Sequence, residues 1–339
     1  MRIRLIGSAM LAAAFVPFAV DVSEPAAAAS AARAHYVVIT GDSHYVVYAE
    51  AVRSHRLDPV TLGAADDIYA LGKTGKPIHL GKAAASPQLI SLSRSHVVIV
   101  NPFKHHERVR SFDLGSGAHS AIGTNEDVVG ATPDGWIAKD KGFTDGTHVV
   151  ARADSGGITD YGTPLTPGVD FGVAVGPNGF VAYADNFQNS NGEVTYTPWA
   201  HPSVHRTLLA PGGKDVRCDS VSSSYAACVV GSGLKRFVEL IALDGKTRAL
   251  GGNRCANQLA VWGSQVAWNV VITQHMCERG QLGLMTTSGT TKKSKLRFDP
   301  LAVTTAWGRL VTSDRGQRDL VTLRKIRGKP ITLKRARIS

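Results

Sequence analysis

The chain has 339 residues, of which 43% are hydrophobic and 35 are glycine, and it carries a formal net charge of +11. After residue 20 no stretch is apolar enough to span a bilayer, which excludes further membrane-spanning helices. No phosphate loop, dinucleotide fingerprint or G-x-S-x-G nucleophile elbow occurs, so the sequence offers no catalytic or nucleotide-binding signature.

The first residues are typical of an exported protein. Residues 1–4 include two arginines, residues 5–20 form an almost uninterrupted apolar run, and small residues over 26–34 offer several A-x-A cleavage points. We therefore predict a signal peptide and linker over residues 1–34, with the mature chain starting between Ala29 and His35. An uncleaved membrane anchor is the alternative.

One sequence motif recurs along the remaining chain with a period of roughly 40 to 50 residues. It consists of a short turn and an apolar strand that ends in a polar or acidic residue. Such a period is typical of solenoids and propellers, whose units bury their faces against neighbouring units. The seven copies cover residues 43–50, 95–101, 133–140, 177–185, 224–229, 264–269 and 308–314.

Each copy fits a unit of four antiparallel strands. The first unit contains apolar segments over 36–39, 45–49, 67–71 and 77–80, the last two joined around a Lys-Thr-Gly-Lys turn. Four such strands form one propeller blade. We predict an all-β chain with a single β-propeller over residues 35–333 and a basic tail over 334–339. Seven blades fit best, and six or eight remain open.

The turns of these units resemble a known family. The residues Pro133-Asp134-Gly135, Ser313-Asp314-Arg315-Gly316 and the Asp244-Gly245 hairpin are similar to the TolB-type and WD40-like propeller repeats, in an exported bacterial protein. The resemblance covers most of the mature chain and implies the fold. It also implies a binding scaffold, because propellers of this kind mostly bind partners. Some are fused to hydrolase domains, for which no residues remain here.

Four cysteines lie late in the chain, where an oxidising compartment would pair them. Cys218 and Cys228 flank a Ser-rich turn symmetrically, so we expect them opposite each other in a hairpin. Cys255 and Cys277 are then left as a second pair. Spacings of ten and twenty-two residues do not match a tetrahedral zinc site.

The loops predict where a partner would bind. In a propeller, the connections between second and third strands open on one face, which we call the long-loop face. These connections are long and polar, whereas the turns between first and second strands are tight. Variable loops on a rigid scaffold are common binding sites. The predicted long connections are 51–66, 102–108, 141–147, 186–193 and 271–280.

Three groups of residues are candidates for binding on this face. One recurs at the ends of the second strands and would form a ring, although Asx turns explain these residues equally well. The second is a histidine pair, whose adjacent members point in opposite directions in an extended chain. The third lies beside Cys277, and both of these groups could equally be solvated loop residues. The candidates are Glu50, Asn101, Asp140, Asp185, Asn269 and Asp314, then His105 and His106, then His275, Glu278 and Arg279.

Two further segments need an interpretation. Asp154-Ser155-Gly156-Gly157 imitates the nucleophile segment of trypsin-like proteases, but it falls where the third unit needs a hairpin turn. Residues 292–339 carry fourteen lysines and arginines against three acidic residues. This basic region predicts non-specific contact with anionic envelope polymers, and a solubilising edge is the alternative.

We therefore expect a secreted or envelope-associated, non-enzymatic scaffold that binds a protein or glycan partner through the long-loop face. The alternative is an extracytoplasmic hydrolase or lyase with a polar site at the central channel, and a structural surface-layer role is a third possibility. We expect a monomer without cofactor or metal. Because the chain starts with a first strand and ends with a fourth, the ring should close by packing and not by a shared blade.

Overall fold

The computed structural model describes fifteen segments of the chain. They are residues 35–51, 66–83, 89–103, 106–166, 170–184, 192–212, 215–231, 237–246, 248–252, 256–270, 281–288, 291–295, 300–314, 320–323 and 331–332. The predicted signal peptide and basic tail lie outside these residues. No helix in the described part is both long and apolar enough to cross a membrane.

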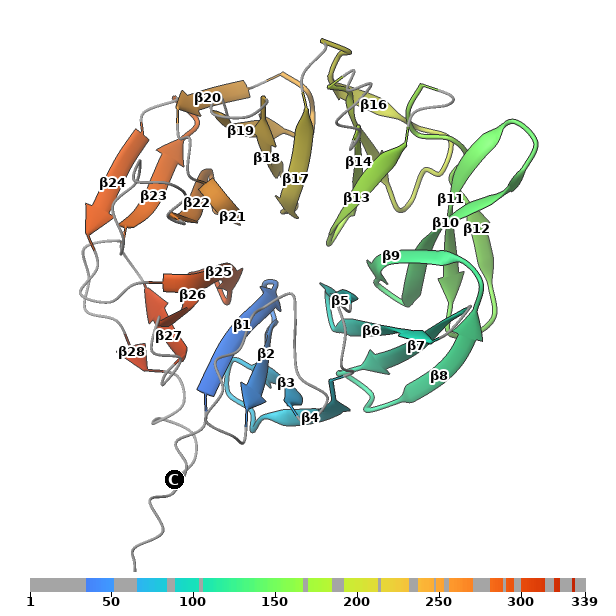
Figure 1. The fold of residues 1–339 in the computed structure, drawn as a ribbon, viewed down its shortest axis with the longest axis horizontal. Helices are drawn as coiled ribbons and strands as arrows, with labels where there is room; N and C mark the ends of the chain where they lie inside the picture. Colours follow the sequence, from blue (N-terminus) through green and yellow to red (C-terminus); the bar gives the residue numbers. More distant parts are fainter. Residues whose placement is uncertain are drawn as a thin grey trace, which may run out of the picture. The chain divides into compact units, whose positions relative to one another are not determined.

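The described strands form seven antiparallel sheets of four strands each, arranged as a seven-bladed β-propeller (Figure 1). The prediction of seven blades is confirmed. Blade 1 contains β1 (His35–Gly41), β2 (Tyr45–Ala51), β3 (Asp67–Gly72) and β4 (Ile78–Lys82), and blade 2 contains β5 (Leu89–Ser93), β6 (His96–Phe103), β7 (His106–Asp113) and β8 (His119–Thr124). Blade 3 contains β9 (Asp127–Thr132), β10 (Gly135–Phe143), β11 (Gly146–Ala153) and β12 (Ile158–Asp160). Blade 4 contains β13 (Phe171–Gly176), β14 (Gly179–Ala184), β15 (Val194–Pro198) and β16 (Arg206–Leu209).

Blades 5 to 7 follow the same plan, with strands in sequence order across each sheet. The predicted Asp244-Gly245 hairpin joins the last two strands of blade 5, where Gly245 has a φ of +74°. Blade 5 contains β17 (Val216–Val221), β18 (Tyr225–Val230), β19 (Phe237–Ala242) and β20 (Arg248–Gly252). Blade 6 contains β21 (Ala256–Trp262), β22 (Gln265–Val270), β23 (Gln281–Thr286) and β24 (Thr291–Lys295). Blade 7 contains β25 (Pro300–Ala306), β26 (Arg309–Asp314), β27 (Leu320–Leu323) and β28 (Ile331–Thr332).

The first strand of each blade lies nearest the axis, and first strands of successive blades contact one another (Figure 1). Apolar clusters fill the spaces between blades. Because a neighbouring blade covers each sheet face, second strands are apolar on both faces, and Val97 to Val100 of β6 are at most 3% exposed. Each such side chain contributes roughly 1.5–3 kcal/mol by burial.

Among the described strands, blades 1 and 7 meet without sharing one, as predicted. Ala306, Val311 and Leu320 of blade 7 pack into the apolar cluster of blade 1. Polar contacts reinforce this junction, since the Trp307 indole Nε1 donates to the His44 carbonyl at 2.6 Å.

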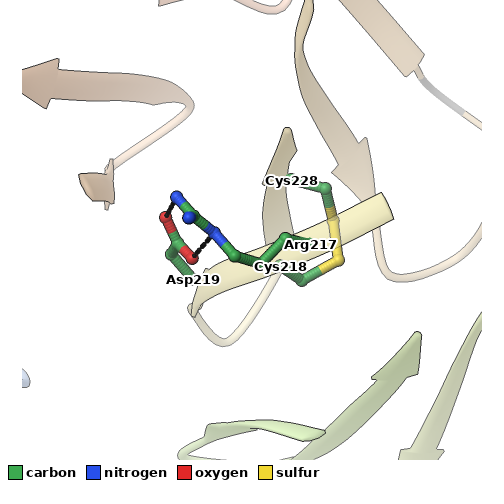
Figure 2. The surroundings of a disulfide bond; sticks show 4 residues. All are labelled: Arg217, Cys218, Asp219 and Cys228. Atoms are coloured by element: carbon green, nitrogen blue, oxygen red, sulfur yellow. Dashed lines mark hydrogen bonds and ion pairs between the residues drawn. A yellow bond between two sulfur atoms is a disulfide. The ribbon is translucent and has the colours of Figure 1, made fainter. Parts of the chain in front are cut away.

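The predicted disulfide joins Cys218 and Cys228, which are cross-strand partners in β17 and β18. Both cysteines are buried in the apolar cluster between blades 4 and 5. Figure 2 shows that Arg217 and Asp219 extend from the other side of β17, away from the sulfur atoms. Cys255 and Cys277 lie outside the described residues.

Candidate functional site

A cavity of about 470 Å³ lies where the first strands end and turn into the second strands. We call this position the tight-turn end of the channel. The final residues of β1, β5, β13, β17, β21 and β25, with the turns that follow them, line the cavity. Six of the seven blades therefore contribute to one hollow, and its volume lies in the range of small-ligand sites.

Blade 3 is missing from the cavity wall because blades 2 and 4 meet across it. Strands β5 and β13 contact each other although they belong to non-adjacent blades. The Ser93 hydroxyl donates to the Gly176 carbonyl at 3.4 Å, and Arg94 Nε donates to the Pro177 carbonyl at 3.1 Å. The side chain of Arg94 thus spans the position that blade 3 would otherwise occupy.

Arg94 also has an unusual backbone conformation. It occupies a two-residue turn between the paired residues Ser93 and His96, and its φ is +55°. Only glycine adopts such a φ without steric cost, and the left-handed conformation costs an ordinary residue about 1–2 kcal/mol. The turn therefore holds the arginine at a cost in local stability.

Asp219 faces the cavity because β17 bulges at this residue. Cys218 pairs with Cys228 and Ser220 with Ala227, which leaves Asp219 as the extra residue. Its carboxylate accepts bonds of 2.8 and 3.0 Å from Arg217 (Figure 2). It also accepts a bond of 3.3 Å from the Leu259 amide. Burial raises the pKa of Asp219, and Arg217 counteracts that effect.

Other polar side chains of the first strands connect neighbouring blades. Ser220 Oγ accepts from the Val261 amide at 3.1 Å, and Gln258 Oε1 accepts from the Val303 amide at 3.2 Å. These two inner-strand amides are thereby satisfied. These groups stabilise the ring and have less capacity left for a ligand.

Asp42 is engaged by its own turn. Its Oδ1 accepts from the amides of His44 and Tyr45 at 2.7 and 2.9 Å. Its Oδ2 is buried without a partner in the described part of the chain, and burial raises the pKa of this carboxyl. The carboxylate therefore presents little surface to a ligand.

The predicted strand-end residues lie at the other end of the blades. From Tyr45 at the tight turn to Glu50 the chain advances about 17 Å. Tyr36 donates to Glu50 at 3.1 Å, and the pKa of Glu50 is raised by burial and then by Asp67. Asp140 accepts from the Gly142 amide at 2.8 Å, so it forms the Asx turn that was the alternative explanation.

The structure describes only some of the remaining predicted binding residues. Asn101 lies in β6 with its Oδ1 buried and without a partner among the described residues. His106, Asn269 and Asp314 lie in strands, but their side chains are outside the described part. Asp185, His105, His275, Glu278 and Arg279 lie wholly outside it. Asp314 is the last residue of β26, the second strand of blade 7, and so lies at the end of the strand that corresponds to Glu50 in blade 1.

Two of the predicted long loops are wrong. Strand β6 continues to Phe103, which pairs with His106, so only residues 104 and 105 lie between the paired residues. Strand β10 continues to Phe143, which pairs with Gly146, and this connection is a two-residue turn. Pro102 fits this extension because β5 pairs with β6 only as far as Val100, which leaves the proline nitrogen on an unpaired edge. The long-loop face is therefore less open at blades 2 and 3 than the sequence suggests.

A serine, a histidine and an aspartate meet between blades 2 and 3 without forming a nucleophilic triad. Nε2 of His96 lies 2.5 Å from Ser111 Oγ and 3.2 Å from Asp154 Oδ2. A triad uses both imidazole nitrogens, one for each partner. Ser111 is 1% exposed and cannot reach a substrate. The predicted turn over Asp154–Gly157 joins β11 to β12, and Ser155 is exposed there without a hydrogen bond to a histidine among the described residues.

His148 of β11 is clamped by two carboxylates. Nε2 lies 2.9 Å from Asp145, Nδ1 lies 3.0 Å from Asp160, and the Phe143 ring stacks on the imidazole. Burial lowers the pKa of His148, but the bonds to both carboxylates outweigh it and raise the pKa overall. No group of three or more His, Cys, Asp or Glu residues in the described segments suits a metal ion.

Comparisons with solved structures agree with the fold. A prolyl endopeptidase superimposes with a TM-score of 0.59 at 10% identity, over 86% of this chain and 47% of that one. The propeller domain of the trilobed protease from Pyrococcus furiosus, described as having an open velcro topology, gives 0.53 at 9% identity over 88% and 95%. TolB from Acinetobacter baumannii gives 0.44 at 14% over 77% and 63%. This chain spans about half of the prolyl endopeptidase.

The likenesses to the prolyl endopeptidase and to the archaeal propeller domain show the propeller fold alone. No protein-family model matches the sequence, and no curated protein matches it.

The sequence did not point to the cavity, because its residues come from the tight turns that looked like scaffolding. One local signal was present. Arg94 lies in a two-residue turn between two apolar strands, a position where glycine or asparagine is usual. An arginine there is a conformational exception, and such exceptions gather at functional sites.

Proposed function

We propose that this protein is a non-enzymatic, extracytoplasmic propeller that binds a protein or glycan of the cell envelope. The observation that carries the proposal is the cavity at the tight-turn end, which six blades build and whose wall includes Arg94. The sequence placed the partner on the long-loop face. Much of that face lies outside the described residues, so the cavity is the better supported contact.

Binding is favoured over catalysis by the side chains around the cavity. Among the described lining residues, no serine or threonine hydroxyl is hydrogen-bonded to a histidine ring, and a nucleophile without a positioned base is inert. An extracytoplasmic location is supported by the buried disulfide, which is typical of oxidising compartments. The apolar run near the N-terminus supports the same location.

A capture experiment tests this function. Full-length protein is immobilised and exposed to envelope and secreted material in about 0.5 M salt, where the Debye length falls to roughly 4 Å. Ser223 is an exposed lining residue, so Ser223→Trp should block the cavity without disturbing the core. Ser155→Trp, in an exposed outer turn, is the matched control.

A partner retained by the wild type and by Ser155→Trp, but lost with Ser223→Trp, would support the proposal. Equal retention by all three proteins would place binding elsewhere. Conversion of the captured material, or of a panel of peptides and glycans, would overturn the non-enzymatic role and favour the hydrolase or lyase alternative.

We also propose, as a second and weaker function, that the basic region over residues 292–339 makes non-specific contact with anionic envelope polymers. Strand β24, which contains three of its lysines, is the outermost strand of blade 6. Contact of this kind should weaken steeply as salt is raised, whereas cavity binding should persist.

A further inference from the structure

Exposed polar side chains surround the cavity at its tight turns, and we call them the polar rim. They come from the turns between the first and second strands of blades 1, 2, 4 and 5. The polar rim consists of Ser43, His44, Arg94, Asn178 and Ser223. Hydroxyl and amide groups each donate and accept hydrogen bonds, so the rim offers both functions to a ligand.

Neither sign of charge dominates the cavity wall. Arg94 is accompanied by two aspartates, and its Nε is bonded to the Pro177 carbonyl. Asp219 is bonded to Arg217, and Asp42 accepts from two amides of its own turn. A ligand with a net charge of either sign would meet a like charge as well as an opposite one. The wall therefore favours a neutral, polar ligand.

Trp262 adds a flat apolar surface to this wall. It is partly exposed, lines the cavity and packs against the apolar cluster shared by blades 6 and 7. Its Nε1 donates to the Gly308 carbonyl of blade 7 at 3.2 Å. Because this bond occupies the indole donor and holds the ring between two turns, a ligand gains contact with the ring surface alone.

Most other apolar residues of the wall are occupied by packing between blades. Leu92, Leu259, Val261 and Val303 are buried in the inter-blade clusters. A peptide anchored by an apolar side chain would need a pocket that these residues do not leave open. A ligand that lies flat on one ring and forms hydrogen bonds at its edge needs no such pocket.

A neutral sugar has this combination of properties. Its hydroxyl groups lie around the edge of the ring, and its C–H bonds form an apolar face that can lie on an indole. Hydroxyls that leave water need polar partners, which the polar rim supplies. The volume of about 470 Å³ is in the range of small-ligand sites.

We propose that the cavity binds a neutral glycan, with Trp262 as the surface on which a sugar ring stacks and Asn178 among its hydrogen-bonding partners. This inference rests on the proposed binding function and specifies which of its two ligand classes, protein or glycan, the cavity takes.

The test is isothermal titration calorimetry of the full chain with neutral trisaccharides. The probes are maltotriose, mannotriose, galactotriose and N-acetylated chitotriose, with trigalacturonate as the anionic comparison. At least one neutral sugar should bind, and trigalacturonate should bind no better. The affinity for the neutral sugar should be equal in about 0.05 and 0.5 M salt, because salt screens interactions between charges.

Two substitutions assign the binding to the cavity. Trp262→Ala should weaken it about tenfold or more, whereas Trp262→Phe should retain part of the affinity because an aromatic face remains. Asn178→Ala should weaken binding about two- to tenfold, as expected for the loss of one hydrogen bond. If Trp262→Ala melts below the assay temperature, Trp262→Phe and Asn178→Ala carry the test.

Phe143→Ala and Asn125→Ala are the matched controls. The Phe143 ring is 37% exposed at the end of β10, and Asn125 is exposed between β8 and β9. Neither residue lines the cavity. Both variants should bind the sugar as the wild type does, and thermal melting of each protein verifies that the fold is intact.

The inference is overturned if no neutral trisaccharide binds, if trigalacturonate binds better than all of them, or if Trp262→Ala and Asn178→Ala bind like the wild type. If no sugar binds but Ser223→Trp still abolishes capture of an envelope protein, the glycan assignment fails and the binding function stands. If no sugar binds and Ser223→Trp captures the same material as the wild type, the proposed function of the cavity fails as well.

Discussion

The packing of a glycine against an indole in blade 6 gives the sharpest prediction about the fold. Gly283 of β23 is the cross-strand partner of Trp268 in β22. A Cβ atom at Gly283 would lie 1.9 Å from Cε2 of that indole, 2.2 Å from Nε1 and 2.3 Å from Cζ2. Trp268 is fully buried in the apolar cluster between blades 5 and 6, so it cannot turn away.

The expected cost of Gly283→Ala follows from these distances. The ring would have to move by about 1.5 Å to restore an ordinary contact near 3.4 Å. Overpacking of this kind costs about 1–3 kcal/mol, and we expect the upper end because neighbours enclose the indole. At about 2 °C per kcal/mol for a domain of this size, the melting temperature should fall by about 6 °C.

A double-mutant cycle isolates the cause. Trp268→Leu removes the clashing atoms and is itself destabilising. In that background Gly283→Ala should cost less than about 1 kcal/mol, which gives a coupling energy well above the error of urea or thermal unfolding. Gly75→Ala is the control, since nothing lies within 4 Å of its Cβ position, and it should change stability by less than about 0.5 kcal/mol. Wild-type melting of Gly283→Ala, or an equal cost in both backgrounds, would refute the reasoning.

Three further outcomes are expected. Replacing Cys218 and Cys228 by alanine should cost about 2–3 kcal/mol, because a ten-residue loop is no longer closed in the unfolded chain; an unchanged urea midpoint would count against this. Trp307→Phe should remove about 1 kcal/mol and speed amide exchange in β1, whereas Trp262→Phe, which loses a bond between blades 6 and 7, should leave β1 protected. His148→Gln should destabilise most below about pH 6.5, and the loss should vanish as the pH rises through the raised folded-state pKa, when the wild-type histidine also becomes neutral. Chemical unfolding from pH 5 to 9 measures this, and a pH-independent loss would contradict it.

The sequence motif that recurs seven times was sufficient to predict the blades, because its apolar strand is buried on both faces of the sheet. A second strand such as β6 has neighbouring blades against both faces, so its apolar residues are consecutive and visible in the sequence. The Cys218–Cys228 bridge was equally accessible, because cross-strand partners in a hairpin are symmetric about its turn. Loop lengths were harder to predict from the sequence, because the end of a strand depends on its pairing with the next strand. Phe103 and His106, for example, pair beyond the predicted end of the second strand of blade 2.

What the sequence by itself determined is therefore local: the strands, their turns, the repeat number and one disulfide, each of which depends on residues close in the chain. The cavity was decided only by the tertiary structure. Ser93 meets Gly176 across 83 positions, and Arg94 reaches Pro177 over the same separation, past a whole blade. No periodicity encodes that contact, because it arises when the ring brings the ends of six inner strands together around one axis.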